Sequence, residues 1–147
     1  MTAAHIELID RNVQQTNIWL NEVAEACGVE DRHAAYRILR AFLHALRDRI
    51  TVDEAAQLAA QLPELMRGIY YEGWDPSRTP EKYHEAEPFL RRIAKEALLA
   101  GTTEASYAAA GAASVLRRHV SEGEIRDVLA MLPGPVREIV EPPNRGA

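Results

Sequence analysis

Three residues with metal-ligating side chains, Glu81, His84 and Glu87, recur at a spacing of three. On a helix this spacing places two carboxylates and one imidazole along one side, where they could hold a metal ion. A dinuclear carboxylate centre would need a second such motif and further carboxylates. A single triplet is more typical of a solvated helix face, so these residues are the metal candidates although we expect neither a metal site nor a cofactor.

Nucleophilic catalysis has little support among the other reactive side chains. The single cysteine, Cys27, lies near the expected carboxyl end of a helix, whose dipole disfavours a thiolate. The serines lie in no nucleophile elbow, and the sequence contains no phosphate-binding loop or dinucleotide fingerprint. The sequence therefore favours a protein without catalytic residues.

Five titratable side chains follow one face of the helix expected over 31–50. His33, Arg37, Arg40, His44 and Arg47 are spaced by four and three residues, opposite an apolar stripe. Arginine forks on such a ridge could bind an anion, an acidic partner or nucleic acid, although an ordinary solvated face shows the same pattern. The net charge of −5 argues against nucleic-acid binding, which depends on neutralising phosphates.

An aromatic loop follows, in which Tyr70, Tyr71 and Trp74 lie between Arg67 and Asp75. Rigid rings beside an arginine are typical of protein-binding hot spots, so these five residues are candidates for binding a partner protein or a second copy of the chain. The same composition suits a structural seam between two modules, because each ring carries a polar tip. Both interpretations stay open.

The elements that position these side chains occur twice, at an offset of 70 residues. The offset pairs Trp19 with Phe89, Leu46 with Leu116, Glu54 with Glu124, Leu62–Pro63 with Leu132–Pro133, and Arg67 with Arg137. Apolar residues recur at helical spacing in both copies, and no alternating run supports a strand. We expect an all-α fold of two tandem repeats, with about four helices each, packed about a pseudo-twofold axis into one compact domain.

Local signals predict where several helices begin and end. Thr16 or Asn17 should cap the first helix and Gly28 should stop it, whereas its counterpart should start at 79–80 and break at Pro88. Two capping boxes, Thr51-x-x-Glu54 and Ser121-x-x-Glu124, should start the third helix of each copy, with each carboxylate returning to the N–H of its own cap residue.

The alanine-rich stretch 108–113 is small on every face. Its Gly111 costs a helix about 1 kcal/mol relative to alanine, which indicates a close contact that compensates. We expect the large residues of helix 31–50 to fill this surface.

Two strings, Leu46-Arg-Asp-Arg-Ile-Thr51 and Leu62-Pro-Glu-Leu-Met-Arg-Gly-Ile-Tyr-Tyr-Glu-Gly-Trp74, resemble the bacterial domain-of-unknown-function family 2267. His84 before an acidic stretch and Phe89-Leu90 are also similar to the family pattern, and the resemblance covers about residues 16–140. It implies a helical tandem-repeat protein, mostly stand-alone and cytoplasmic. The family has no assigned reaction, so no catalytic residue is carried over.

The 147 residues are expected to divide into repeat 1 (16–70), an aromatic connector (71–79), repeat 2 (80–140) and a flexible tail (141–147). The first twenty residues lack the unbroken apolar run of a secretion signal, and no later run reaches membrane length. A cytoplasmic protein without membrane contact is therefore expected.

These patterns together predict a non-enzymatic interaction or adaptor protein. It would bind a protein partner or itself through the aromatic connector and the cationic helix face. The first alternative is a small-molecule or metal site in a cleft between the repeats, around Tyr71, Trp74 and His84. The second alternative is nucleic-acid binding through the arginine ridge.

Overall fold

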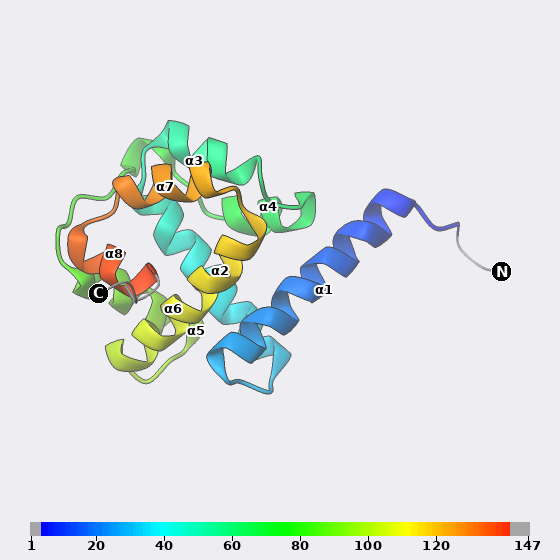
Figure 1. Ribbon diagram of the computed structural model, residues 1–147, viewed down its shortest axis with the longest axis horizontal. Helices are drawn as coiled ribbons and strands as arrows, with labels where there is room; N and C mark the ends of the chain where they lie inside the picture. The colour runs from blue at the N-terminus through cyan, green and yellow to red at the C-terminus, as the bar shows by residue number, and fades with distance from the viewer. Residues whose placement is uncertain (1–3, 142–147) are drawn as a thin grey trace.

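Eight α-helices and one short 3-10 helix form the regular structure of residues 4–141, which the computed structural model describes (Figure 1). The elements are α1 (Glu7–Cys27), α2 (Arg32–Arg49), α3 (Val52–Ala59), α4 (Glu64–Tyr71), η1 (Pro76–Arg78), α5 (Ala86–Ala97), α6 (Thr102–His119), α7 (Glu122–Ala130) and α8 (Gly134–Val140). The all-α prediction is confirmed, since these residues contain no strand. None of the helices is long and apolar enough to cross a membrane. The predicted flexible tail lies, beyond residue 141, outside the described residues.

The helix boundaries repeat along the chain at the offset found in the sequence. Helices α2 and α6 begin and end 70 residues apart, at Arg32 and Thr102 and at Arg49 and His119. The starts of α3 and α7, the starts of α4 and α8, and the ends of α1 and α5 show the same separation. Four helices, α1–α4, are thus followed by four more in the same order.

The two capping boxes form only in part. The hydroxyls of Thr51 and Ser121 accept hydrogen bonds from the backbone N–H groups of Glu54 and Glu124 at 3.2 and 3.3 Å, as expected. The return contact predicted for the second box is wrong, because the Ser121 N–H donates instead to Gln61 Oε1 at 2.8 Å. Both glutamates are buried between α3 and α7.

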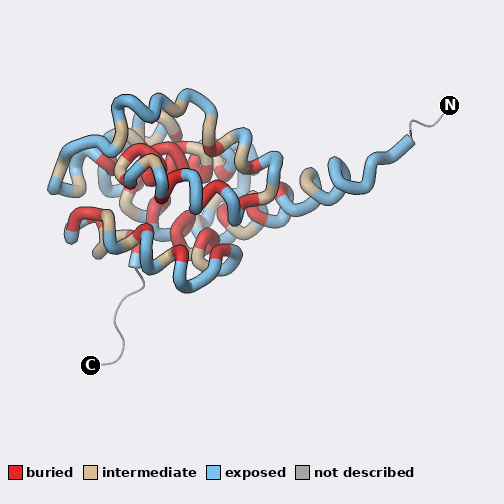
Figure 2. Tube along the Cα trace, turned by 90° about the horizontal axis from the view of Figure 1, so that it is seen from above, coloured by how far each residue is buried: buried red, intermediate tan, exposed pale blue. Residues whose placement is uncertain are grey.

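Helix α1 is longer than the sequence signals indicate. It begins at Glu7, and the Thr16 hydroxyl donates to the Asn12 carbonyl at 2.8 Å inside the helix, so the prediction of a cap at position 16 or 17 is wrong. Its end is as predicted, because Gly28 adopts the left-handed conformation, with φ of 67°, that closes a helix. The first half of α1 projects from the body of the protein (Figures 1 and 2).

Helix α5 starts later than expected. A cis peptide joins Thr79 to Pro80, the chain stays non-helical through residue 85, and α5 begins at Ala86. Pro88 lies in the first turn of α5, where backbone N–H groups have no hydrogen-bond partner within the helix. Its lack of an N–H therefore does not break the helix. The predicted start at 79–80 is therefore wrong.

The core is built by the long helices of both halves. Helix α2 packs against α1 and α5, and α6 packs against α1 and α5. The rings of Phe42 and Phe89 meet edge to face with centroids 6.4 Å apart, which joins the halves at the centre. Both rings are 1% exposed, so this contact lies fully inside the apolar core.

Gly111 marks a close approach between α6 and α1. A Cβ atom at this position would lie 2.6 Å from Cys27 Sγ and 3.3 Å from backbone atoms of Ala26. The predicted tight contact at Gly111 is therefore found, but its partner is the last turn of α1, and the expectation that helix 31–50 fills this surface is wrong here. The helical pattern identified a small surface without identifying which helix covers it.

We expect Gly111→Ala to lower the free energy of unfolding by about 1–3 kcal/mol, because overpacking outweighs the gain in helix propensity. Gly68→Ala is the matched control: Gly68 lies within α4 with nothing within 4 Å of the added Cβ, so the same exchange should stabilise by about 0.4–1 kcal/mol. Urea unfolding measures both values. A stabilised Gly111→Ala variant would contradict the close contact.

Candidate functional site

The cationic face predicted on α2 divides into an accessible part and a buried part. His33 is exposed, and Arg37 and Arg40 are half-buried. His44 and Arg47 are only 4% and 1% exposed, so the expectation of one solvent-facing ridge is wrong for these two residues. These two residues are buried because α4 and α5 pack against this part of α2. The spacing of residues within one helix does not reveal which part of the helix other helices cover.

Arg47 is buried, and all three nitrogens of its guanidinium group donate hydrogen bonds. Nε and Nη2 donate to the two carboxylate oxygens of Asp48 at 2.8 and 3.0 Å. Nη1 donates to the backbone carbonyls of Tyr70 and Glu72 at 2.7 and 2.8 Å. A buried cation is tolerated only when it is paired and hydrogen-bonded. Arg47 therefore fixes the path by which the chain leaves α4.

Asp48 extends this pairing to the second half of the chain. Arg92 of α5 also donates to Asp48, and to Glu81 at 3.0 Å. Burial raises the pKa of Asp48, but hydrogen bonds from Arg47 and Arg92 outweigh burial and hold the pKa below its ordinary value. The charged carboxylate thus links guanidinium groups of α2 and α5.

A second charged cluster joins α2 to α5. The ring nitrogens of His44 lie 2.5 Å from Glu96 Oε1 and 2.7 Å from the Ile69 carbonyl oxygen, so the ring satisfies both acceptors only when it carries two protons. Arg40 donates to Glu96 at 2.9 Å and to Glu72 at 2.8 Å. Burial raises the pKa of Glu96, yet the hydrogen bond with His44 and the nearby positive charges hold it below its ordinary value.

The aromatic loop packs against the body of the protein. Tyr70 is fully buried, and its hydroxyl donates to the Ala55 carbonyl at 2.8 Å. The ring centroids of Tyr70 and Tyr71 lie 5.2 Å apart, and those of Tyr71 and Trp74 lie 5.1 Å apart. Asp75 is exposed and accepts from the N–H at the start of η1. These contacts favour the seam interpretation.

Arg67, the remaining residue of the predicted partner site, completes the end of α3. Its Nε donates to the Ala59 carbonyl at 2.9 Å, and its Nη2 donates to the Leu62 carbonyl at 3.1 Å. Carbonyls at a helix end lack partners within the helix, so a half-buried arginine that reaches them is a structural contact. Partner binding through the loop stays a prediction.

The three metal candidates do not share one side of a helix. Residues 80–85 are non-helical, and of the three only Glu87 lies in α5. Glu81 pairs with Arg92, Glu87 pairs with Arg91, and His84 is exposed. The helical spacing on which this candidate site depended is therefore absent from the segment, because α5 begins at Ala86.

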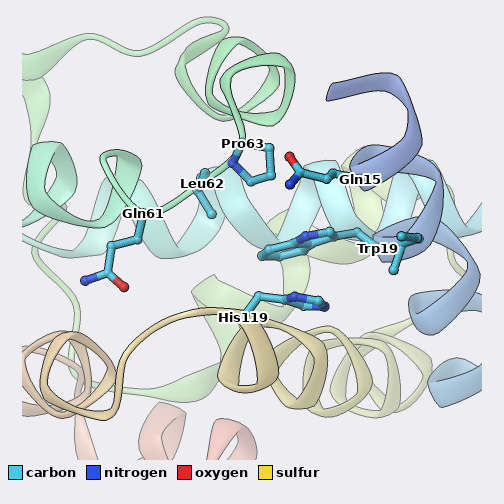
Figure 3. A pocket seen from close by; sticks show the side chains of 7 residues that line it. Gln15, Trp19, Gln61, Leu62, Pro63 and His119 are labelled. Carbon is cyan, nitrogen blue, oxygen red and sulfur yellow. The ribbon is translucent and has the colours of Figure 1, made fainter. Parts of the chain in front are cut away.

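A hollow of about 480 Å³ lies between α1, the turn before α4 and the end of α6 (Figure 3). Trp19 and His119 line it as stacked rings 4.5 Å apart. His119 is already held by Glu22 at 2.7 Å, and both amide atoms of Gln61 bond Ser121, at 3.0 and 2.8 Å. His119 and Gln61 are thus engaged within the chain, and Gln15 also lines the hollow.

Cys27, the only sulfur nucleophile of the chain, is placed unfavourably for catalysis. Burial raises the pKa of its thiol to about 11, so the thiol is protonated at neutral pH. Its Sγ donates to the Ala108 carbonyl at 3.7 Å, in the close contact between α1 and α6. The residue acts as a small core side chain.

The family of uncharacterised conserved proteins DUF2267 matches residues 16–139, which is most of the chain. The chain belongs to this family. The predicted resemblance is thereby confirmed. The DUF2267 match begins inside α1 and ends inside α8. No curated protein matches the chain.

The projecting half of α1, residues 6–15, precedes the DUF2267 match, and we call it the α1 arm. Ile6, Ile9 and Val13 are 60%, 56% and 46% exposed along it. Its described hydrogen bond to the body runs from the Leu65 N–H to Asn12 Oδ1 at 3.1 Å. The capping residues Thr16 and Asn17 predict a helix start that excludes the arm, although Ile9 and Val13 continue the spacing of the residues that follow.

Replacing Arg47 in this DUF2267 protein should be costly, because Asp48 would keep a buried charge with one partner fewer. We expect Arg47→Met to lower the free energy of unfolding by about 3–5 kcal/mol. Arg91→Met is the matched control: Arg91 is exposed on α5 and pairs only with Glu87 four residues away, so its loss should cost less than about 0.5 kcal/mol. Chemical denaturation distinguishes the two, and equal losses would contradict the role assigned to Arg47.

Proposed function

We propose that this protein is a non-enzymatic interaction protein and that the α1 arm is its docking surface, which binds the same arm of a second copy. One observation carries the proposal: the apolar stripe of α1 continues beyond the body, where nothing among the described residues covers it. The stripe consists of Ile9, Val13, Thr16, Leu20, Val23 and Cys27, spaced alternately by four and three residues. Thr16 and Val23 are buried, whereas Ile9 and Val13 are exposed.

Alternating spacings of three and four are typical of a helix that pairs with another helix. Inside the body this stripe of α1 meets α2 and α6. Outside the body the apolar side chains of the stripe can be buried only against a partner of similar shape. A second α1 arm supplies such a shape, because a twofold pairing places one stripe against its own copy.

The charges beside the stripe support pairing between copies. Arg11 pairs with Glu7 in its own helix at 3.1 Å, and both side chains are exposed, so two arms in antiparallel orientation can share these opposite charges. The arm has few turns, and its buried area would be at the low end for specific interfaces. We therefore expect weak association, with dissociation constants on the order of 10–100 μM.

The aromatic loop and the cationic face, which the sequence predicts as binding surfaces, are weaker candidates for docking than the α1 arm. Most of the aromatic loop packs inward, and Arg40 pairs with Glu72 and Glu96. The same pairing weakens nucleic-acid binding at Arg40, whose charge is already neutralised, whereas Arg37 forms no ion pair among the described residues. A hollow of about 590 Å³ near the predicted cleft is lined mainly by polar residues such as Asp75 and Arg92, and Tyr71, Trp74 and His84 are not among its lining residues, so it gives the small-molecule alternative less support.

We also infer that the two halves are copies of one unit, related by a pseudo-twofold axis. Support comes from contacts that recur at the 70-residue offset, in addition to the helix boundaries. The recurring contacts are Arg47 with the Tyr70 carbonyl and Arg117 with the Val140 carbonyl, and Arg67 with the Ala59 carbonyl and Arg137 with the Leu129 carbonyl. Equivalent arginines thus anchor equivalent carbonyls.

A cytoplasmic location remains part of the proposal. The single cysteine has no partner for an internal disulfide, and its thiol lies in the contact with α6. A reducing compartment suits such a residue.

The double variant Ile9→Glu with Val13→Glu should abolish self-association, because it places charge on both exposed positions of the stripe. Gln14→Glu is the control for added charge, since Gln14 is exposed outside the stripe and adds one negative charge to the arm without changing an apolar position. Sedimentation velocity between about 10 and 100 μM should show a reversible dimer for the wild type and for Gln14→Glu only. A wild-type chain that stays monomeric throughout this range would overturn the proposal.

A further inference from the structure

The packing of α3 against α7 brings together acidic residues that lie 70 positions apart. Thr51, before α3, donates to Met131 Sδ, after α7, at 3.6 Å. Gln61, after α3, bonds Ser121, before α7. The two helices therefore run antiparallel across the contact between the halves, as the adjacent α3 and α7 ribbons in Figure 1 show.

Glu54 of α3 and Glu124 of α7 face one another within this contact. Each residue is 6% exposed, and one oxygen of each carboxylate, Oε2, is buried without a hydrogen-bond partner. Asp127, one turn after Glu124, adds a third carboxylate from the surface, and one oxygen of each residue lies within 4.8 Å of the other two. Buried carboxylate oxygens are rarely left unsatisfied, so the arrangement calls for an additional group.

Among the described residues, no positively charged side chain forms an ion pair with these carboxylates. None of the ion pairs includes Glu54, Glu124 or Asp127. Tyr70 of α4 also lies near Glu124, but its hydroxyl donates to the Ala55 carbonyl. Burial, followed by the hydrogen bond and charge of Glu54, raises the pKa of Glu124 to about 8.

We propose that Glu54, Glu124 and Asp127 bind one hard divalent cation between α3 and α7. Oxygens that bind one calcium ion at 2.3–2.6 Å lie no more than about 5 Å apart, so separations below 4.8 Å are compatible with one shared ion. An all-carboxylate ligand set selects calcium, magnesium or manganese over softer metals. The exposed position of Asp127 leaves one side open for ion entry and for water ligands.

The cation would connect the two halves at a position where each contributes a first-turn glutamate. The sequence identifies Glu54 and Glu124 as members of two capping boxes and as equivalent positions of the repeat, but it does not predict that they meet. Their meeting depends on α3 and α7 lying side by side, which no local pattern specifies.

The test uses the full chain after treatment with a chelator. Calorimetric titration with Ca²⁺ and with Mg²⁺, and electron paramagnetic resonance with Mn²⁺, should show one site per chain for at least one of these ions. Glu124→Gln and Asp127→Asn should each weaken binding at least about tenfold. Glu122→Gln is the matched control, because Glu122 is an exposed acid in the first turn of the same helix and its loss should leave binding unchanged.

Two results would overturn the proposal. One is the absence of binding by the wild type up to about 10 mM of all three ions, which would leave a proton shared by Glu54 and Glu124 as the only occupant. The other is equal weakening by Glu122→Gln and Asp127→Asn, which would indicate diffuse attraction to an acidic surface. Asp127 is exposed, so its variant should stay folded and keep the test valid if Glu124→Gln unfolds.

Discussion

The buried guanidinium group of Arg47 is the constraint on which the arrangement of the first half depends. Its hydrogen bonds reach Asp48 in its own helix and two carbonyls at the end of α4, so α2 and the start of the connector cannot separate without exposing an unpaired charge to the core. Through Asp48 the same network reaches Arg92 of α5. Charge pairing therefore determines how the two halves meet along this seam, and the apolar side chains pack around it.

Three kinds of contact join the halves, each with a different physical basis. Ion pairs and the edge-to-face rings of Phe42 and Phe89 connect α2 with α5. The lack of a side chain at Gly111 lets α6 approach the last turn of α1. The glutamates of α3 and α7 face one another with unsatisfied oxygens. The first two contacts are complete within the chain, whereas the third leaves a buried oxygen of each glutamate without a hydrogen-bond partner.

The same distinction separates structural from functional surfaces. Most of the aromatic and cationic side chains that look like binding residues in the sequence have partners inside the chain, and such groups have little left to offer a ligand. The α1 arm is different, because it carries large apolar side chains in register with a buried stripe, and within residues 4–141 nothing covers Ile9 and Val13. The DUF2267 match covers nearly all of the body and begins inside α1, so the family describes the scaffold rather than the arm.

The sequence by itself determined the helices, the repeat offset and most helix ends, because these depend on spacing and on local partners such as Thr51 and Gly28. It failed where a helix lacked such signals, as at the start of α1, and where proline had two compatible roles, as at Pro88. Only the tertiary structure decided that Arg47 is buried, that Gly111 meets α1 and that Glu54 meets Glu124. Burial depends on which other helix covers a face, and the periodicity within one helix does not indicate which helices pack against it.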